Sequence, residues 1–312
     1  MKLGFLTACM PERELGEIAK WAGEHGYEAL EIAAWPQIAD RPFTASHIAA
    51  DAFDDAEADR VSGALADNGL VLNSIAFYPN NLDPDPAERE INHTHLRACI
   101  DAAAALGGPP VGTFIGRDPG KSVADNLREA ERVFPPLVDY AGEREVRLMI
   151  ENCVMEGWHP DGGPGNLAYS PELWEWMFEL GLYLNFDPSH LMWLGIDPIE
   201  ALRPYVDKVI NAHAKDAETF PEKRNRYSFF GLQRGREKNP WDMGWWRYRI
   251  PGLGEVDFPK YVDTLYEGGF DGVLAVEHED PVWGGTPEKV EAGLEIAERN
   301  LRPLIVSERN ER

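Results

Sequence analysis

The stretch LYLNFDPSH, residues 182–190, begins as a short apolar run and ends in side chains that carry charge or bind metals. Its first five residues are rich in Leu, Tyr and Phe, which favour a buried β-strand. Asp187 and His190 follow where such a strand would end. The same order recurs in RLMIE (147–151), KVINAH (208–213) and GVLAVE (272–277), so four strands deliver Glu, Asp, His and Glu in turn.

Outward from these segments, short strand-like runs and longer helical stretches alternate along the whole chain. The runs predict strands over Leu3–Thr7, Ala29–Ile32, Val71–Phe77, Val111–Ile115, Arg147–Ile150, Leu182–Asp187, Val209–His213 and Gly272–Glu277. Helical periodicity predicts helices over Glu12–His25, Ala56–Asp67, Glu88–Leu106, Val123–Tyr140, Pro171–Leu180, Phe258–Tyr266 and Glu288–Arg299. The alternation predicts the α/β class and one domain over residues 1–312, a (β/α)8 TIM barrel.

Residues 217–250 interrupt the alternation after the seventh strand. The segment is rich in arginine, glycine and aromatic residues and has no sustained period. In a barrel it would lie at the C-terminal face, where active sites are built. Because Trp241, Trp245 and Trp246 would leave an apolar patch on a bare loop, we expect a lid or a subunit interface. A decorated surface loop is the alternative.

Composition argues against several classes of partner. The 30 Lys+Arg and 54 Asp+Glu residues give a net charge of −24, which disfavours nucleic acid or an anionic membrane surface. Cys9, Cys99 and Cys153 are far apart and lack C-x-x-C spacing, which indicates reduced thiols. No run approaches the ~20 apolar residues of a membrane span. With no signal-peptide pattern at the start, we expect a cytoplasmic protein.

The charged strand ends predict a metal site. In a closed barrel Glu151, Asp187, His213 and Glu277 would converge at one mouth. Three carboxylates that close repel one another unless they are protonated or bridged by a cation. Three oxygen ligands and one imidazole suit Mn²⁺, Mg²⁺ or Co²⁺, of which we favour Mn²⁺. Taken singly, each of these residues could instead cap a helix or lie in a solvated loop.

Together these residues resemble the xylose-isomerase-like TIM barrel proteins, which include sugar-phosphate isomerases and epimerases, ketose 3-epimerases and inosose dehydratases. The resemblance spans nearly the whole chain. Its motifs are Glu151-Asn152, Asp187-Pro188-Ser189-His190, His213-Ala214-Lys215-Asp216, PGLGEVDF (251–258) and GGFDG (268–272) leading to Glu277.

The resemblance implies roles for individual residues. It implies that Glu151, Asp187, His213 and Glu277 bind one divalent metal and that the two glutamates also transfer protons. It further implies that His190 contacts a substrate oxygen, that Arg249, with Arg247 as a rival, helps to hold the substrate, and that the chain forms a dimer or tetramer.

Three further residues, two of them within these motifs, are candidates for substrate binding. His159, in the loop after Glu151, could act as an additional base for elimination, or be an ordinary loop histidine. Lys215 could stabilise an enediolate oxygen. Asp216 could hold His190 or Lys215, and ordinary ion pairing accounts for both residues equally well.

Proton transfer beside a carbonyl is the chemistry that this set supports. A keto-sugar or keto-glycoside chelating the cation would lose a proton to give a metal-stabilised enediolate. Return of the proton from the other face gives epimerisation, and return to the neighbouring carbon gives isomerisation. We predict a sugar isomerase or epimerase of this type. The alternative is a lyase on the same scaffold, either an inosose dehydratase or an enzyme that eliminates from a 3-keto-glycoside or C-glycoside.

Two other classes share parts of this pattern. An apurinic-site endonuclease would use the same barrel, but it needs more histidine ligands and a basic face, which the charge of −24 argues against. A non-catalytic sugar-binding subunit, part of a hetero-oligomer, would hold no tightly bound ion.

Overall fold

The computed structural model describes residues 1–38, 45–159, 163–231 and 242–306. Within these ranges eight parallel strands close a barrel in the order β1-β10-β7-β6-β5-β4-β3-β2. Their bounds are β1 Lys2–Leu6, β2 Ala29–Ala33, β3 Val71–Ala76, β4 Val111–Thr113, β5 Leu148–Glu151, β6 Tyr183–Phe186, β7 Val209–Ala214 and β10 Val273–Val276. Each of the eight predicted strands is confirmed to within two residues at either end.

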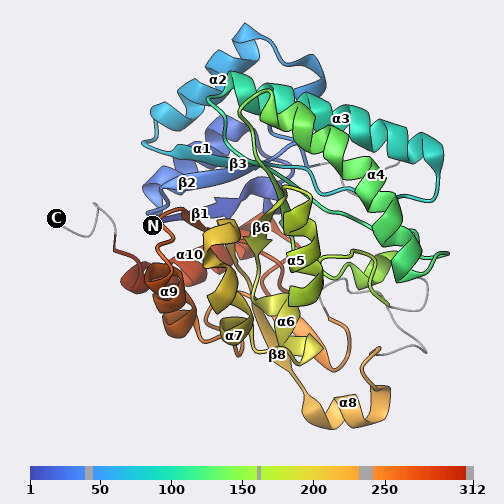
Figure 1. Cartoon of the computed structure of the whole chain (residues 1–312). Helices are drawn as coiled ribbons and strands as arrows, with labels where there is room; N and C mark the ends of the chain where they lie inside the picture. The colour runs from blue at the N-terminus through green and yellow to red at the C-terminus, as the bar shows by residue number, and fades with distance from the viewer. Residues whose placement is uncertain (39–44, 160–162, 232–241, 307–312) are drawn as a thin grey trace.

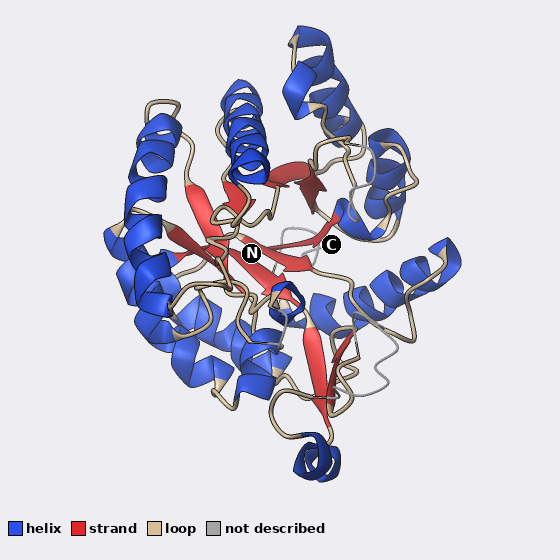
Figure 2. Ribbon diagram, turned by 90° about the vertical axis from the view of Figure 1, so that its right-hand side faces the viewer, coloured by secondary structure: helices blue, strands red, loops and turns tan. Residues whose placement is uncertain are grey.

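Helices pack around the outside of the strands (Figure 1, Figure 2). The predicted helices are confirmed as α1 Leu15–Glu24, α2 Asp55–Ala66, α3 Pro86–Ala105, α4 Val123–Gly142, α5 Pro171–Glu179, α9 Phe258–Glu267 and α10 Pro287–Leu301. Two short helices that the periodicity did not predict, α6 Ser189–Leu194 and α7 Pro198–Leu202, follow β6. No described helix combines the length and the apolar character needed to cross a bilayer.

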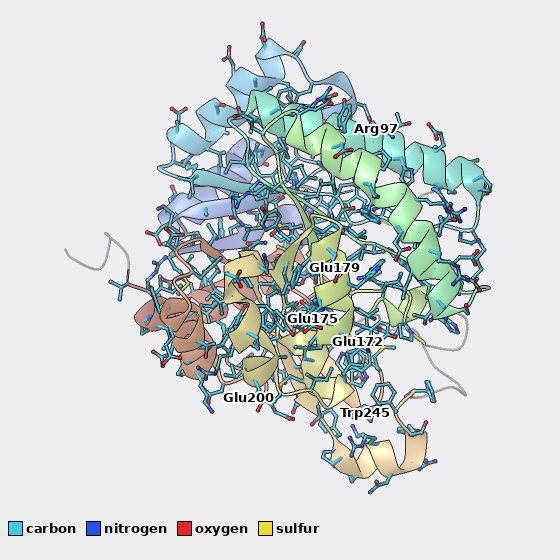
Figure 3. All side chains as sticks on the ribbon, in the orientation of Figure 1. Arg97, Glu172, Glu175, Glu179, Glu200 and Trp245 are labelled. Atoms are coloured by element: carbon cyan, nitrogen blue, oxygen red, sulfur yellow. The ribbon has the colours of Figure 1, made fainter. Side chains whose placement is uncertain are left out.

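Each covering helix buries one face and exposes the other. In α5, Leu173, Trp174 and Met177 are buried against the barrel. The acidic residues of the same helix, Glu172, Glu175 and Glu179, are exposed, and Figure 3 labels them along this helix. Acidic residues on solvated helix faces such as this one contribute to the high negative charge of the chain.

The insertion after β7 forms an antiparallel hairpin, β8 Asp216–Thr219 and β9 Trp246–Arg249, with helix α8 Pro221–Tyr227 at its tip (Figure 1). Trp245 and Trp246 are each only 2% exposed, so these two residues leave no apolar patch on the surface, and the role of the insertion as a lid or subunit interface stays a prediction. Trp246 stacks on Trp193 of α6 with ring centroids 4.4 Å apart, which ties the hairpin to the barrel. Trp241 lies outside the described residues.

Asp216 fastens the base of this hairpin. Its carboxylate accepts hydrogen bonds from the backbone N–H groups of Ala217, Gly252, Gly254 and Val256, at 2.8–3.0 Å. Burial raises the pKa of Asp216 to about 6, and the four N–H donors act in the opposite direction by favouring the charged form. The prediction that Asp216 holds His190 or Lys215 is therefore wrong, because both of its oxygens are occupied by backbone donors.

Replacing Asp216 by Ala should lower the free energy of unfolding by about 3 kcal/mol or more, because each buried donor left unpaired costs about 1–3 kcal/mol. Urea unfolding at neutral pH measures the change. Asp207→Ala is the matched control, since Asp207 is 70% exposed. A loss for Asp216→Ala no greater than that of the control would contradict the anchoring role.

Candidate functional site

The C-terminal ends of β5, β6, β7 and β10 bring the predicted site residues together. Glu151 ends β5, Asp187 and Glu277 directly follow β6 and β10, and His213 lies in β7. Oxygens of Glu151, Asp187 and Glu277 and a ring nitrogen of His190 all lie within 4.8 Å of one another. The structure therefore gathers three predicted carboxylates and places His190, expected only to contact substrate, among the possible ligands.

His213 lies beside this cluster with its two ring nitrogens facing in different directions. Nδ1 is 3.1 Å from Oε2 of Glu277 and 3.7 Å from Oε1 of Glu151. Nε2 is 3.0 Å from Oε2 of Glu31. Burial lowers the pKa of His213, but the charges of Glu31 and Glu277 outweigh it and hold the pKa well above its ordinary value. The role of His213 as a metal ligand stays a prediction, with Nδ1 as the nitrogen that faces the carboxylates.

Glu31 is a buried residue of the site that the sequence reasoning missed. It lies in β2 and is fully buried inside the barrel. Besides contacting His213, its carboxylate accepts hydrogen bonds from the Tyr78 hydroxyl at 2.7 Å and from Asn211 Nδ2 at 2.7 Å. The Tyr78 oxygen in turn accepts from Asn185 Nδ2 at 2.9 Å. Glu31 is thus held by Tyr78, Asn211 and His213, and it fixes the Nε2 edge of the His213 ring.

A signal for Glu31 was present in the sequence. The second strand, ALEIA, has a carboxylate in the middle of an otherwise apolar run. Strands of a parallel barrel are buried on both faces, so a charge there is costly unless a partner compensates it. A lone internal Glu in such a strand indicates a partner at the centre of the barrel.

Lys215 places a buried ammonium among the carboxylates. Its Nζ donates to Glu277 Oε2 at 2.8 Å and Glu279 Oε2 at 3.0 Å, and lies 3.3 Å from Asp187 Oδ2. Burial alone would raise the pKa of Glu277, but Lys215 and His213 outweigh it and hold the pKa well below its usual value. Burial and the neighbouring carboxylates raise the pKa of Glu279 to about 8, although Lys215 acts against them. Lys215 is at the site, as predicted, together with a glutamate that was not predicted.

The insertion contacts the ring nitrogen of His190 that does not face Glu151. Its Nε2 lies 3.1 Å from Glu151 Oε1, and its Nδ1 lies 2.8 Å from the hydroxyl of Tyr248 in β9. Lys215 Nζ packs 4.5 Å from the centre of the Tyr248 ring. Hairpin β8–β9 therefore contributes a side chain that touches the site.

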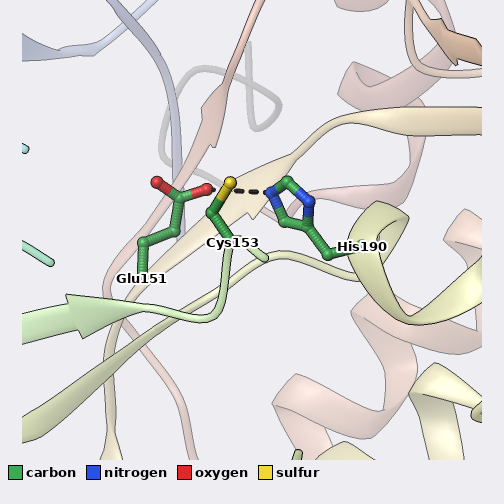
Figure 4. Close-up of side chains that lie close together, drawn as sticks. All are labelled: Glu151, Cys153 and His190. Carbon is green, nitrogen blue, oxygen red and sulfur yellow. Dashed lines mark hydrogen bonds and ion pairs between the residues drawn. The ribbon is translucent and has the colours of Figure 1, made fainter. Parts of the chain in front are cut away.

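Cys153 lies two residues beyond Glu151 and on the same side of the chain (Figure 4). Its Sγ, an oxygen of Glu151 and a ring nitrogen of His190 are all within 4.8 Å of one another. Burial, followed by the charge of Glu151, raises the pKa of the Cys153 thiol well above its usual value.

The remaining predicted substrate-binding residues are two paired arginines and a loop histidine. The guanidinium of Arg249 donates to Asp280 at 3.0 Å and to Glu218 at 2.8 Å. Its rival Arg247 also pairs with Glu218. His159 is half-buried in the loop after β5. Substrate contact by Arg249 and His159 stays a prediction.

Aromatic rings border the mouth on the side of β2 to β5. Tyr78 lies 6.1 Å from Trp35 and 4.9 Å from Phe114, measured between ring centroids. Phe114 continues the row to Trp158 at 5.5 Å. The mouth thus has an aromatic side and, across β6, β7 and β10, a charged side.

The residues present fit a divalent cation. Asp187 is fully buried, yet its Oδ2 accepts no hydrogen bond from any described residue. The carboxylates of Glu151 and Glu277 beside it repel it and each other. Oxygen-rich sets with imidazole suit divalent ions of the manganese, magnesium or cobalt type. The structure therefore contains a possible metal site at Glu151, Asp187, His190 and Glu277, with His213 adjacent.

Replacing Glu31 by Gln should weaken Mn²⁺ binding by about 10–100-fold, as is typical when the partner of a metal-bound histidine is lost. The physical reason is that neutral Gln no longer fixes Nε2–H of His213. Calorimetric titration of metal-free protein with MnCl₂ measures the affinity. Glu28→Gln is the matched control, because Glu28 precedes the same strand and pairs with Arg302 instead. Equal affinities in the two variants would refute the role of Glu31.

Comparison with known proteins gives a matching family model, curated relatives and solved structures. A family model described as the xylose isomerase-like TIM barrel matches residues 19–300. Inosose dehydratase of Clostridium perfringens is 35% identical over 105 residues, a match that covers only 32% of this chain and 32% of that protein.

Two solved structures share the fold across almost their whole length. The 3-keto-D-glucoside 4-epimerase YcjR from E. coli has a TM-score of 0.68 at 13% identity, covering 97% of this chain and 99% of its own. The IolI protein with a bound zinc atom has a TM-score of 0.66 at 19% identity, covering 97% and 96%. At these identities the two structures show the fold alone. Since the family model covers most of this chain, the chain belongs to the xylose isomerase-like TIM barrel family.

Proposed function

We propose that this chain is a divalent-metal-dependent isomerase or epimerase of a keto-sugar or keto-glycoside. The observation that carries the proposal is the pair of glutamates, Glu151 and Glu277, whose carboxylates share one buried cluster with Asp187 and His190. Two carboxyl groups at one reacting centre can remove a proton and return one, which is what inversion or migration of a proton requires.

The protonation of the two glutamates suits these roles. Burial and the charge of Glu277 raise the pKa of Glu151, whereas hydrogen bonds from His190 and His213 lower it, and the net shift is downward. Both glutamates are therefore charged at neutral pH, so either can accept the substrate proton, and the one that returns a proton from the other face first takes that proton up from solvent. His190, held by Tyr248, lies 3.1 Å from Glu151 Oε1 and can support that oxygen as it takes up and releases the proton.

Glu151, Asp187 and Glu277 would hold the metal, with His213 or His190 as the nitrogen ligand, and we favour Mn²⁺ among the possible ions. When bound, the cation supplies Lewis-acid polarisation of the substrate carbonyl. The zinc atom named for the IolI structure supports a metal in this fold. Lys215, fully buried and charged, would orient a substrate oxygen beside Glu277.

A lyase on the same scaffold is the second candidate. The 35% identity with an inosose dehydratase over 105 residues favours it. So does Glu279, which lies beside Lys215 and whose raised pKa, about 8, keeps it protonated at neutral pH and able to donate to a leaving hydroxyl. An elimination of this kind would release water and change the mass of the product, whereas epimerisation and isomerisation would not.

Solvent deuterium exchange tests the proposal. Ketohexoses, inososes and 3-keto-glucosides are incubated with Mn²⁺-loaded protein in deuterated buffer, and incorporation is followed by mass and NMR spectra. Glu151→Gln and Glu277→Gln should each slow incorporation by roughly 10²–10⁴-fold, the usual contribution of a proton-transfer group.

Glu267→Gln serves as the control, because Glu267 is exposed and pairs with Arg203 on the outer surface. It should exchange at the wild-type rate. Undiminished exchange in either site variant would show that the replaced glutamate does not transfer the proton. A product that has lost water would show that the enzyme is a lyase and not an isomerase.

A further inference from the structure

We propose that the site has a second, sulfur-containing position for a thiophilic divalent ion such as Zn²⁺ or Cd²⁺, formed by Glu151, Cys153 and His190. The ligand atoms of these three residues lie within 4.8 Å of one another, as do those of the oxygen-rich cluster that includes Asp187 and Glu277. The two positions share Glu151 and His190, so an ion at one of them excludes an ion at the other.

Strand geometry explains why the thiol reaches the site. Along an extended chain alternate side chains point the same way, so Cys153, two residues after Glu151, continues on the side that faces the mouth. It packs with Leu6, Ala76, Tyr78 and Phe114 at the aromatic side of the mouth. Asp187 and Lys215 lie on the charged side. The sulfur position is therefore displaced from the oxygen position toward the aromatic rings.

The other two cysteines differ from Cys153 in their surroundings. The Cys9 thiol donates to the carbonyl of Leu6 at 3.4 Å, and the Cys99 thiol donates to that of Ala34 at 3.8 Å. The Cys153 thiol makes no hydrogen bond with any described residue, although it lies beside a carboxylate and an imidazole. The Cys153 thiol is thus available to a metal, and Cys9 and Cys99 provide internal controls.

Ligand chemistry decides which ion takes which position. Thiolate with imidazole and carboxylate suits zinc and its heavier analogues, which commonly have three protein ligands and open positions, whereas carboxylate-rich sites suit Mn²⁺ and Mg²⁺. When the ion binds, a metal–sulfur bond forms and the thiol proton leaves to solvent. With the ion bound, His190 would offer the Nε2 lone pair and carry its proton on Nδ1, 2.8 Å from the Tyr248 oxygen that would accept it.

This inference concerns the metal centre of the proposed function and specifies which ions would displace Mn²⁺ from it. An ion in the sulfur position removes Glu151 from proton transfer, so Zn²⁺ and Cd²⁺ should inhibit by competition with Mn²⁺. The inhibition should depend on Cys153.

Absorption spectroscopy of the Co²⁺-loaded full chain tests the proposal, because a thiolate ligand to Co²⁺ gives a charge-transfer band in the near ultraviolet. The wild type and Cys99→Ser should show the band, and Cys153→Ser should lose it. Calorimetric titration should show Cd²⁺ affinity falling in Cys153→Ser by at least about tenfold, since even outer partners of metal ligands are worth 10–100-fold. Mn²⁺ affinity should stay within about twofold of the wild type.

A wild type that shows no thiolate band on addition of Co²⁺, or a band that persists in Cys153→Ser, would overturn the sulfur position. Deuterium exchange with Mn²⁺ separates this result from the proposed function. Band loss in Cys153→Ser without exchange of any candidate substrate would leave the sulfur position standing and the isomerase wrong. Exchange without the band would leave the isomerase standing and the sulfur position wrong.

Discussion

Mutual repulsion among buried carboxylates is the constraint on which the site depends. Glu31, Glu151 and Asp187 are buried inside one barrel end, and the side chain of Glu277 beside them is 12% exposed, so the charges interact strongly. Nearby positive charges compensate these carboxylates. His213 lies between Glu31 and Glu277, and the Lys215 ammonium lies beside Asp187 and Glu277. A divalent cation would add to these positive charges. The polar interior of the barrel is therefore a compensated cluster, surrounded by an apolar shell that the helices complete.

The period of two along the strands arranges this cluster. In β7 and its continuation, Asn211, His213 and Lys215 follow one another at every second position, and they contact Glu31, Glu277 and Glu279 at successive depths. This strand and its continuation thus contribute Asn211 below the site, the His213 ring at its centre and the Lys215 ammonium at its rim. Function and fold share the same residues, because the inward positions near the strand ends carry polar groups.

Much of the fold could be read from the sequence, because eight apolar runs separated by amphipathic stretches have few other solutions. The carboxylates at Glu151, Asp187 and Glu277 followed from the same pattern, since a strand end fixes where its next residue lies. Glu31 was missed because it lies in the interior of a strand. Tyr248 was missed because it reaches the site through a hairpin, and no periodicity predicts where an insertion returns. Asp216 was misassigned because three of its four partners are backbone groups 36–40 residues away, which no side-chain motif reveals.

The register of the hairpin has a consequence for variation of this site. Antiparallel pairing sets Tyr248 opposite Ala217 and the flanking arginines, Arg247 and Arg249, opposite Glu218 and Asp216. A shift of one residue would turn the phenol outward and present a guanidinium to His190 in its place. A single deletion inside β9 would therefore exchange a neutral neighbour of the imidazole for a cation. The pairing register of β8 and β9 is therefore constrained by the chemistry of the barrel.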